Sequence, residues 1–124
     1  MKRAIKFRGK RLANDEWCYG SLLIWADGDC NILEKSDSSN AVWKREIAPS
    51  TVSQFTGLYD KKGKEIYEGD IIQFPDGDIV DVEYSDSECS FIGGIERLGF
   101  LPTDKATIIG NIHDNPELLK GGIK

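Results

Sequence analysis

The chain has a single histidine, His113, which is the one side chain whose ordinary pKa suits proton transfer near neutral pH. Asp114 follows it in the stretch NIHDNPELL. Adjacency in sequence does not orient an imidazole, because catalytic triads are assembled in space, and no serine or cysteine lies in a GxSxG pattern. A hydrolase that uses His113 with Asp114 or Asp70 is therefore one hypothesis. A structural role for His113 beside a helix start is the interpretation that we favour.

Carboxylates that lie close together in the second half raise the question of a metal site. A hard cation requires oxygen ligands that converge, and a calcium loop alternates its ligands and ends in a bidentate glutamate. The segment PDGD at residues 75–78 is too short for that pattern and predicts a hairpin turn. We expect these carboxylates to bind neither a metal nor a cofactor; they are Asp70, Asp76, Asp78, Asp81 and Glu83.

The cysteines Cys18, Cys30 and Cys89 are widely spaced and include no CxxC pair. A zinc site requires closely spaced soft ligands, and one histidine adds little to such a set. The spacing therefore predicts reduced and mostly buried thiols rather than a metal site.

The start of the chain, MKRAIKFRGKR, is rich in basic residues and has aromatic residues nearby. Such a segment could bind nucleic acid through a positive groove and stacking rings, and a solvated strand face is the alternative that we favour. GNIHDN and FIGGIERLG match neither of the phosphate-loop patterns GxxxxGK[ST] and GxGxxG. Lys2 and Arg3 belong to this basic segment, and the candidates for nucleic-acid contact are Lys6, Arg8, Lys10 and Arg11.

The net charge of −5 is unevenly distributed along the 124 residues. Residues 1–54 carry nine Lys/Arg against seven Asp/Glu, and residues 55–124 carry seven against fourteen. Opposite charges on one chain favour head-to-tail self-association, which closes into a ring where the rotation permits. The length fits one domain, residues 1–124, or two β subdomains, residues 1–54 and 55–124, that share a core. No apolar run approaches a membrane span or a signal h-region, so a cytoplasmic location is the expectation.

Short alternating segments separated by turn residues predict a mainly β fold. At the start, Ile5 and Phe7 alternate with cationic residues, and Val80, Val82 and Tyr84 are expected to point inward in a later strand. We expect either a small SH3-like barrel or two packed antiparallel sheets. One short C-terminal helix is predicted, with Asn115 as N-cap, Pro116 as the first helical residue and Gly121 at the far end.

The stretch FTGLYDKKGKEIYEGDII, residues 55–72, supplies turn formers. Thr56 and Gly57 have turn chemistry, and Asp60 opens a second turn in which Gly63 takes a positive φ. Gly69 suits a sharp entry into the next strand, where Asp70 accepts N–H groups just beyond it. We therefore predict that this stretch is structural rather than catalytic.

Three segments make the chain resemble the YopX-like proteins of phages and prophages, a family without an established biochemical activity. They are TVSQFTGLYDKKGKEIYEGDII, IIGNIHDNPELL and, more loosely, IKFRGKRLANDEWCYGSLL. The resemblance implies a small, mainly β protein of phage or prophage origin that acts in a bacterial cytoplasm, and it implies no catalytic residue. The motif residues, for which we expect structural roles, are Thr56, Gly57, Asp60, Gly63, Gly69, Asp70, Gly110, Asn111, Asn115 and Pro116.

These observations favour a non-enzymatic binding or assembly module without a cofactor. Its partner is a second copy of the chain or a host or phage protein, and no membrane is involved. Nucleic-acid binding through the basic N-terminal strand is the alternative, and a hydrolase that uses His113 is the third hypothesis.

Overall fold

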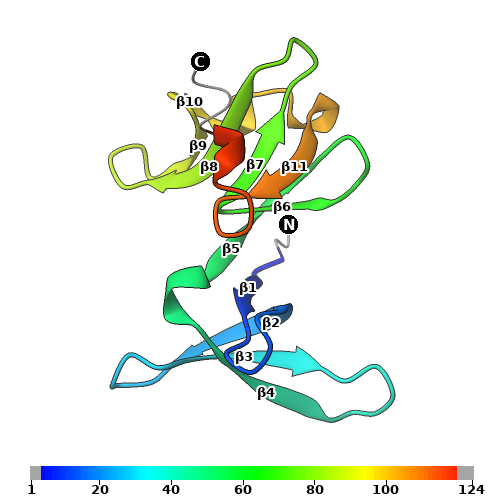
Figure 1. The fold of residues 1–124 in the computed structure, drawn as a ribbon, viewed down its shortest axis with the longest axis vertical. Coiled ribbons are helices and arrows are strands. Elements are labelled where there is room, and N and C mark those ends of the chain that lie inside the picture. The colour runs from blue at the N-terminus through cyan, green and yellow to red at the C-terminus, as the bar shows by residue number, and fades with distance from the viewer. Residues whose placement is uncertain (1–3, 120–124) are drawn as a thin grey trace. The chain divides into compact units, whose positions relative to one another are not determined.

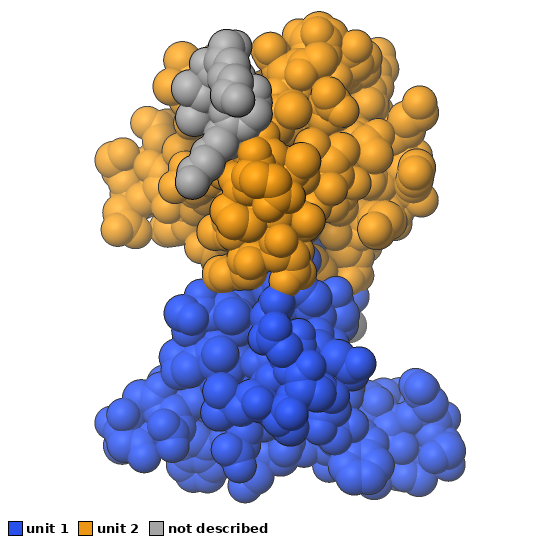
Figure 2. Space-filling model, viewed as in Figure 1, with its two compact units in different colours: residues 1–55 blue, residues 56–124 orange. Residues whose placement is uncertain are grey.

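Figure 1 shows the computed structural model of the chain, which describes residues 4–119. The chain forms two compact units, residues 1–55 and residues 56–124, here called unit 1 and unit 2 (Figure 2). The expected single domain with two subdomains that share a core stays a prediction.

The predicted fold class, mainly β, is confirmed. The strands are β1 Phe7–Lys10, β2 Trp17–Ile24, β3 Cys30–Lys35, β4 Val42–Ile47, β5 Ser53–Tyr59, β6 Glu65–Tyr67, β7 Asp70–Gln73, β8 Ile79–Ser85, β9 Ser90–Gly93, β10 Glu96–Arg97 and β11 Thr107–Asn111. Three short 3-10 helices also form: η1 Pro49–Thr51, η2 Leu98–Phe100 and η3 Thr103–Lys105.

Unit 1 is an antiparallel meander in which the strand order is β4-β3-β2-β1, with the start of β5 beside β1. One face of this sheet is buried around Cys18, Ile32 and Ile47. Strand β2 runs through Gly20 without a break. A Cβ added at Gly20 would lie only 2.0 Å from the carbonyl oxygen of Leu33, so a larger residue would clash there. Glycine therefore allows β2 and β3 to approach closely.

Unit 2 contains the rest of β5 with β6 beside it, and a second antiparallel sheet in the order β10-β9-β8-β7-β11. Ile66, Ile72, Val82 and Leu98 form its buried core together with Ala106. Each of the two sheets ends in two different edge strands, so neither closes on itself. Of the two expected arrangements, the structure has the two antiparallel sheets rather than the SH3-like barrel.

The alternation prediction is wrong at three positions. Arg8 and Lys10, expected on a solvated face, are only 6% and 9% exposed. Trp17 covers them, with the Arg8 guanidinium carbon 4.4 Å and the Lys10 Nζ 5.5 Å from its ring centroid. Tyr84, expected inward, is exposed and packs edge-on against Phe91 with 5.4 Å between ring centroids. The Trp17 ring accounts for the burial of Arg8 and Lys10.

The predicted C-terminal helix begins at residue 117, and its described part is residues 117–119. The carbonyl of Asn115 accepts the N–H of Leu118, as at a helix start, but the Asn115 side chain accepts the N–H of Asn111. The side-chain N-cap prediction is therefore wrong, and Gly121 lies outside the described residues. Within residues 4–119 no helix is long and apolar enough to cross a membrane.

Candidate functional site

The carboxylate of Asp60 is buried and accepts three backbone N–H groups. Oδ1 accepts the N–H of Lys62 at 2.8 Å and of Lys64 at 2.9 Å, and Oδ2 accepts that of Ile108 at 3.1 Å. Burial, the largest influence, raises the pKa of Asp60, but the three donors and the Lys64 charge together outweigh it and hold this pKa below its ordinary value. Asp60 therefore closes its own turn and fastens that turn to β11.

Two glycines confirm the predicted backbone conformations, and one turn prediction is wrong. Gly63 has φ +78° and Gly69 has φ +89°. Thr56 and Gly57 lie inside β5 instead of in a turn, although Gly57 has φ +89°. The hydroxyl of Thr56 donates to the carbonyl of Ile66 at 2.7 Å, so this pair joins β5 to β6.

Asp70 is buried at the start of β7 and holds the entry into that strand. Its Oδ2 accepts the N–H of Tyr67, a residue that precedes it, at 2.7 Å. Acceptance of N–H groups beyond Asp70 stays a prediction. The backbone of Gly69 donates to Val82 at 2.7 Å and accepts from Ile112 at 2.9 Å. Gly69 and Asp70 therefore connect β7 to β8 and to the segment after β11.

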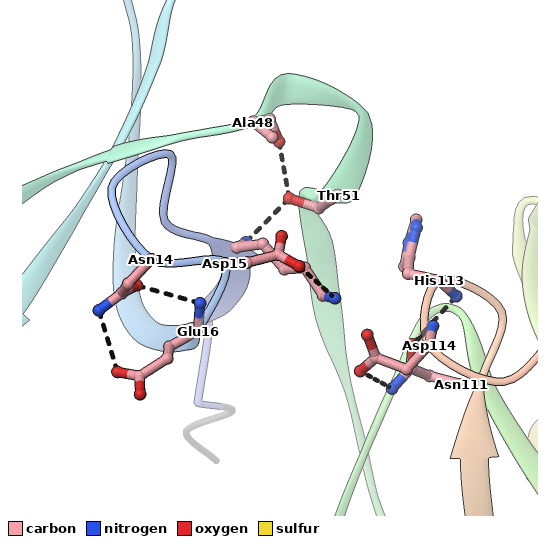
Figure 3. Close-up of polar contacts among 9 residues, drawn as sticks. Asn14, Asp15, Glu16, Ala48, Thr51, Asn111, His113 and Asp114 are labelled. Atoms are coloured by element: carbon pink, nitrogen blue, oxygen red, sulfur yellow. Dashed lines mark hydrogen bonds and ion pairs between the residues drawn. The ribbon is translucent and has the colours of Figure 1, made fainter.

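The stretch GNIHDNP forms a second closed turn (Figure 3). The Oδ1 of Asn111 accepts the N–H groups of His113 at 3.0 Å and Asp114 at 2.9 Å, and its Nδ2 donates to the Asp114 carboxylate at 3.0 Å. Gly110 leaves room for the Asn115 side chain, because an added Cβ would lie 2.6 Å from its Oδ1. Pro116 directly precedes the helical residues 117–119. These contacts account for the motif by turn chemistry.

His113 is half-buried, and its Nε2 lies 3.8 Å from the position that a Cβ on Gly69 would occupy. The imidazole is thus next to the residue that precedes Asp70. The carboxylate of the neighbouring Asp114 accepts a hydrogen bond from the side-chain amide of Asn111, and the hydrolase hypothesis stays a prediction. Its test is whether His113→Ala abolishes an activity found in a broad substrate screen.

Across residues 4–119, no three His, Cys, Asp or Glu side chains lie close enough together to hold a metal ion. In the acidic segment, Asp76 accepts the N–H of Asp78 at 3.0 Å in the hairpin turn that PDGD predicts. Cys18 and Cys30 are buried and Cys89 is exposed, and all three are free thiols. Burial, assisted by the charge of Glu34, raises the pKa of Cys18 to about 11 against the opposing effect of nearby arginines.

The four candidates for nucleic-acid contact do not form a common open surface. Arg8 and Lys10 are buried against Trp17, and Lys6 lies over the ring of Phe55 at 5.3 Å. Arg11 is half-buried, and its backbone forms an isolated antiparallel β-bridge with Ile47. A role of these four residues in binding nucleic acid stays a prediction.

Sequence reasoning missed that the other two tryptophans, Trp25 and Trp43, also have a cationic side chain over the ring. Lys44 Nζ lies 5.5 Å from the ring centroid of Trp25, whose indole N–H donates to Asn31. The guanidinium of Arg45 lies 4.8 Å from the ring centroid of Trp43. The W-K-R run at residues 43–45 was the available signal, but the pairing of Lys44 with Trp25 depends on the sheet.

Unit 2 contains an open groove of about 460 Å³ that sequence reasoning also missed. It lies between the β7–β8 turn and the β9–β10 hairpin. Val80, Leu101 and Phe74 supply apolar walls, and Ile95 at the hairpin tip is 96% exposed. The remaining lining residues are Pro75, Asp76, Asp78, Gly93, Gly94, Glu96 and Pro102. Three of the lining side chains are thus acidic, and none of the described ones is basic.

Comparison with known proteins gives a family and a structural relative. The chain resembles the solved structure described as protein EF1440 from Enterococcus faecalis, with 26% identity and a TM-score of 0.63 over 95% of this chain and 99% of that chain. No curated protein is a significant match. The model of the family described as YopX protein matches residues 6–120. The chain therefore belongs to the YopX protein family.

Proposed function

We propose that the protein is a non-enzymatic binding module that holds a partner protein in the groove of unit 2. The observation that carries this proposal is Ile95, an isoleucine that is 96% exposed at the edge of an apolar groove. Exposing such a side chain to water costs free energy that burial against a partner recovers. The volume of about 460 Å³ falls in the range of about 300–1,000 Å³ that binding pockets have.

The groove selects for charge as well as for apolar surface. Asp76, Asp78 and Glu96 are exposed on its rim, and residues 56–124 carry seven Lys/Arg against fourteen Asp/Glu. A segment that presents an aliphatic or aromatic side chain next to Lys or Arg complements this surface, and an acidic segment is repelled. The proposed ligand class is therefore an apolar and basic protein segment.

Selection from a displayed random peptide library tests this function. We expect the selected peptides to combine apolar residues with Lys or Arg, and to bind Ile95→Ser or Asp76→Lys about tenfold more weakly than the unaltered protein. Ile24→Ser and Asp86→Lys are matched controls, since both residues are exposed and do not line the groove. Peptides without a common pattern, or peptides that bind Ile95→Ser unchanged, would overturn the proposal.

Nucleic-acid binding by unit 1 is the second candidate function, and the tryptophan–cation pairs favour it. Trp25 and Lys44 are both exposed. Proteins that bind single-stranded nucleic acid stack its bases on aromatic rings and hold its phosphates with nearby cations. Quenching of tryptophan fluorescence by a single-stranded oligonucleotide at low salt, lost in Lys44→Glu and retained in Lys61→Glu, would support it. No quenching at low salt would exclude this candidate.

We further propose that the protein is of phage or prophage origin and acts in a bacterial cytoplasm. Membership of the YopX family supports this proposal. Fractionation of a lysogenic strain with a specific antibody would test it, and recovery outside the cytoplasm would contradict it.

A further inference from the structure

We propose that the occupant of the groove is strand β4 of a second copy of this chain, with Trp43 as the inserted side chain. This inference rests on the proposed function and names the partner of the same site. The protein would then associate head to tail, because the groove lies in unit 2 and β4 lies in unit 1.

Strand β4 presents the apolar and basic surface that the groove selects. Trp43 is 52% exposed, and Val42 before it is exposed as well. Arg45 lies on the same face of the strand as Trp43, with its guanidinium over the exposed indole, whereas Lys44 lies on the opposite face, over the ring of Trp25. The guanidinium of Arg45 is held at 3.2 Å from the Glu34 carboxylate and over the Trp43 ring, which fixes the indole and its cation as one unit.

Strand β4 is also accessible, because it is an edge strand. It pairs with β3 on one side, and on the other side the described residues form only one bridge, between Arg11 and Ile47. The backbone N–H of Leu12 donates to the carbonyl of Glu46 at 2.9 Å, so the open part of this edge is the part near Val42 and Trp43. Exposed edges with apolar residues are frequent sites of association between chains.

The charges of the two surfaces are complementary. The rim of the groove carries Asp76, Asp78 and Glu96, whereas β4 carries Lys44 and Arg45 with a single acid, Glu46. Flanking cations protect an edge strand from pairing with a copy of itself, because like charges then meet. Attraction between β4 and an acidic groove instead favours a heterologous contact, which repeats into a ring or a chain of subunits.

Two single variants and their mixture test the inference, with molar mass measured by light scattering over a concentration series at low salt. We expect the unaltered protein to form oligomers, and Trp43→Ser and Ile95→Ser each to be monomeric. Mixing the two variants should give a one-to-one dimer, because the first retains the groove and the second retains β4. High salt should weaken both assemblies, since charge attraction is screened.

The controls separate lost contacts from lost folding. Ile24→Ser, at an isoleucine that is 62% exposed, should oligomerise like the unaltered protein, and all three variants should keep its thermal midpoint. Three results would overturn the inference: a strict monomer at high concentration, oligomers that survive Ile95→Ser, or monomeric variants that fail to combine. If the peptides described above still bind the groove in any of these cases, the proposed function stands and only the identity of the partner is wrong.

Discussion

At the scale of single residues, the two aspartates of the family motif serve the backbone. Asp60 accepts N–H groups from Lys62, Lys64 and Ile108, and Asp70 accepts that of Tyr67. Both carboxylates are buried, and a buried N–H group without an acceptor costs free energy. These aspartates therefore contribute to stability, and the glycines between them allow the backbone to turn.

Replacing Asp60 with asparagine should alter the acid sensitivity of the fold. Because the pKa of Asp60 in the folded state lies below its ordinary value of about 3.9, the unfolded state binds more protons in acid. Its contribution to stability is present above about pH 4 and is lost as the pH falls through the folded-state pKa. Denaturant melts from neutral to acidic pH should show a smaller decline for Asp60→Asn than for the unaltered protein.

The same variant should also be less stable at neutral pH. The amide can keep one oxygen for the N–H groups of Lys62 and Lys64, but its NH₂ would face the N–H of Ile108. The expected loss is about 1–3 kcal/mol in the free energy of unfolding. An unchanged stability at neutral pH together with an unchanged acid profile would contradict this role of Asp60.

Gly69→Val should destabilise the protein by about 1–3 kcal/mol through backbone strain. The space at Gly69 is adequate, since an added Cβ would be 3.6 Å from Ile112, but φ is +89°. Gly99→Val is the matched control, because Gly99 is exposed with no atom within 4 Å of an added Cβ and lies outside the positive-φ region. Equal thermal midpoints for the two variants would remove the strain argument and reopen a functional interpretation of this stretch.

At the scale of elements, irregular turns hold the strands of unit 2 together. Asp60 connects the turn before β6 to β11, and Gly69 connects the entry of β7 to β8 and to Ile112. The turn between Asn111 and Asn115 then fixes the end of β11. Two of the three segments that carry the family resemblance, far apart in sequence, are therefore joined by hydrogen bonds in unit 2.

A double-mutant cycle at Gly110 and Asn115 tests the turn after β11. Gly110→Ala alone should cost about 1–3 kcal/mol, because its Cβ would displace the Asn115 side chain that accepts the N–H of Asn111. In an Asn115→Ala background the same change should cost much less, since the two substitutions remove one interaction. Additive costs measured by chemical denaturation would show that the two residues act independently.

At the scale of the whole molecule, charge and thiols are distributed between two compact units. Unit 1 contains all three tryptophans, each with a cation over its ring, and unit 2 contains most of the acidic residues and the apolar groove. The predicted state of the cysteines is confirmed for Cys18 and Cys30, which are buried, while Cys89 is exposed. Regions of opposite net charge are thus present in one chain.

Thiol titration should distinguish the three cysteines in the native protein. Cys89 should react rapidly with a disulfide reagent, and Cys18 should stay unreactive at neutral pH because burial raises its pKa to about 11. We expect one fast equivalent from the native protein and three after denaturation, with the fast one absent in Cys89→Ser. A second fast equivalent would show that the core of unit 1 opens readily.

The sequence by itself determined the mainly β class, the family and many of the turns. These features depend on local chemistry, such as the positive φ of Gly63, and such chemistry can be read within a few residues. Only the tertiary structure decided which groups meet. The Asp60 carboxylate reaches Ile108 from 48 residues away, Trp17 buries Arg8 and Lys10 across paired strands, and the groove around Ile95 forms between two hairpins. Such partners are set by strand register and packing, which a linear pattern does not contain.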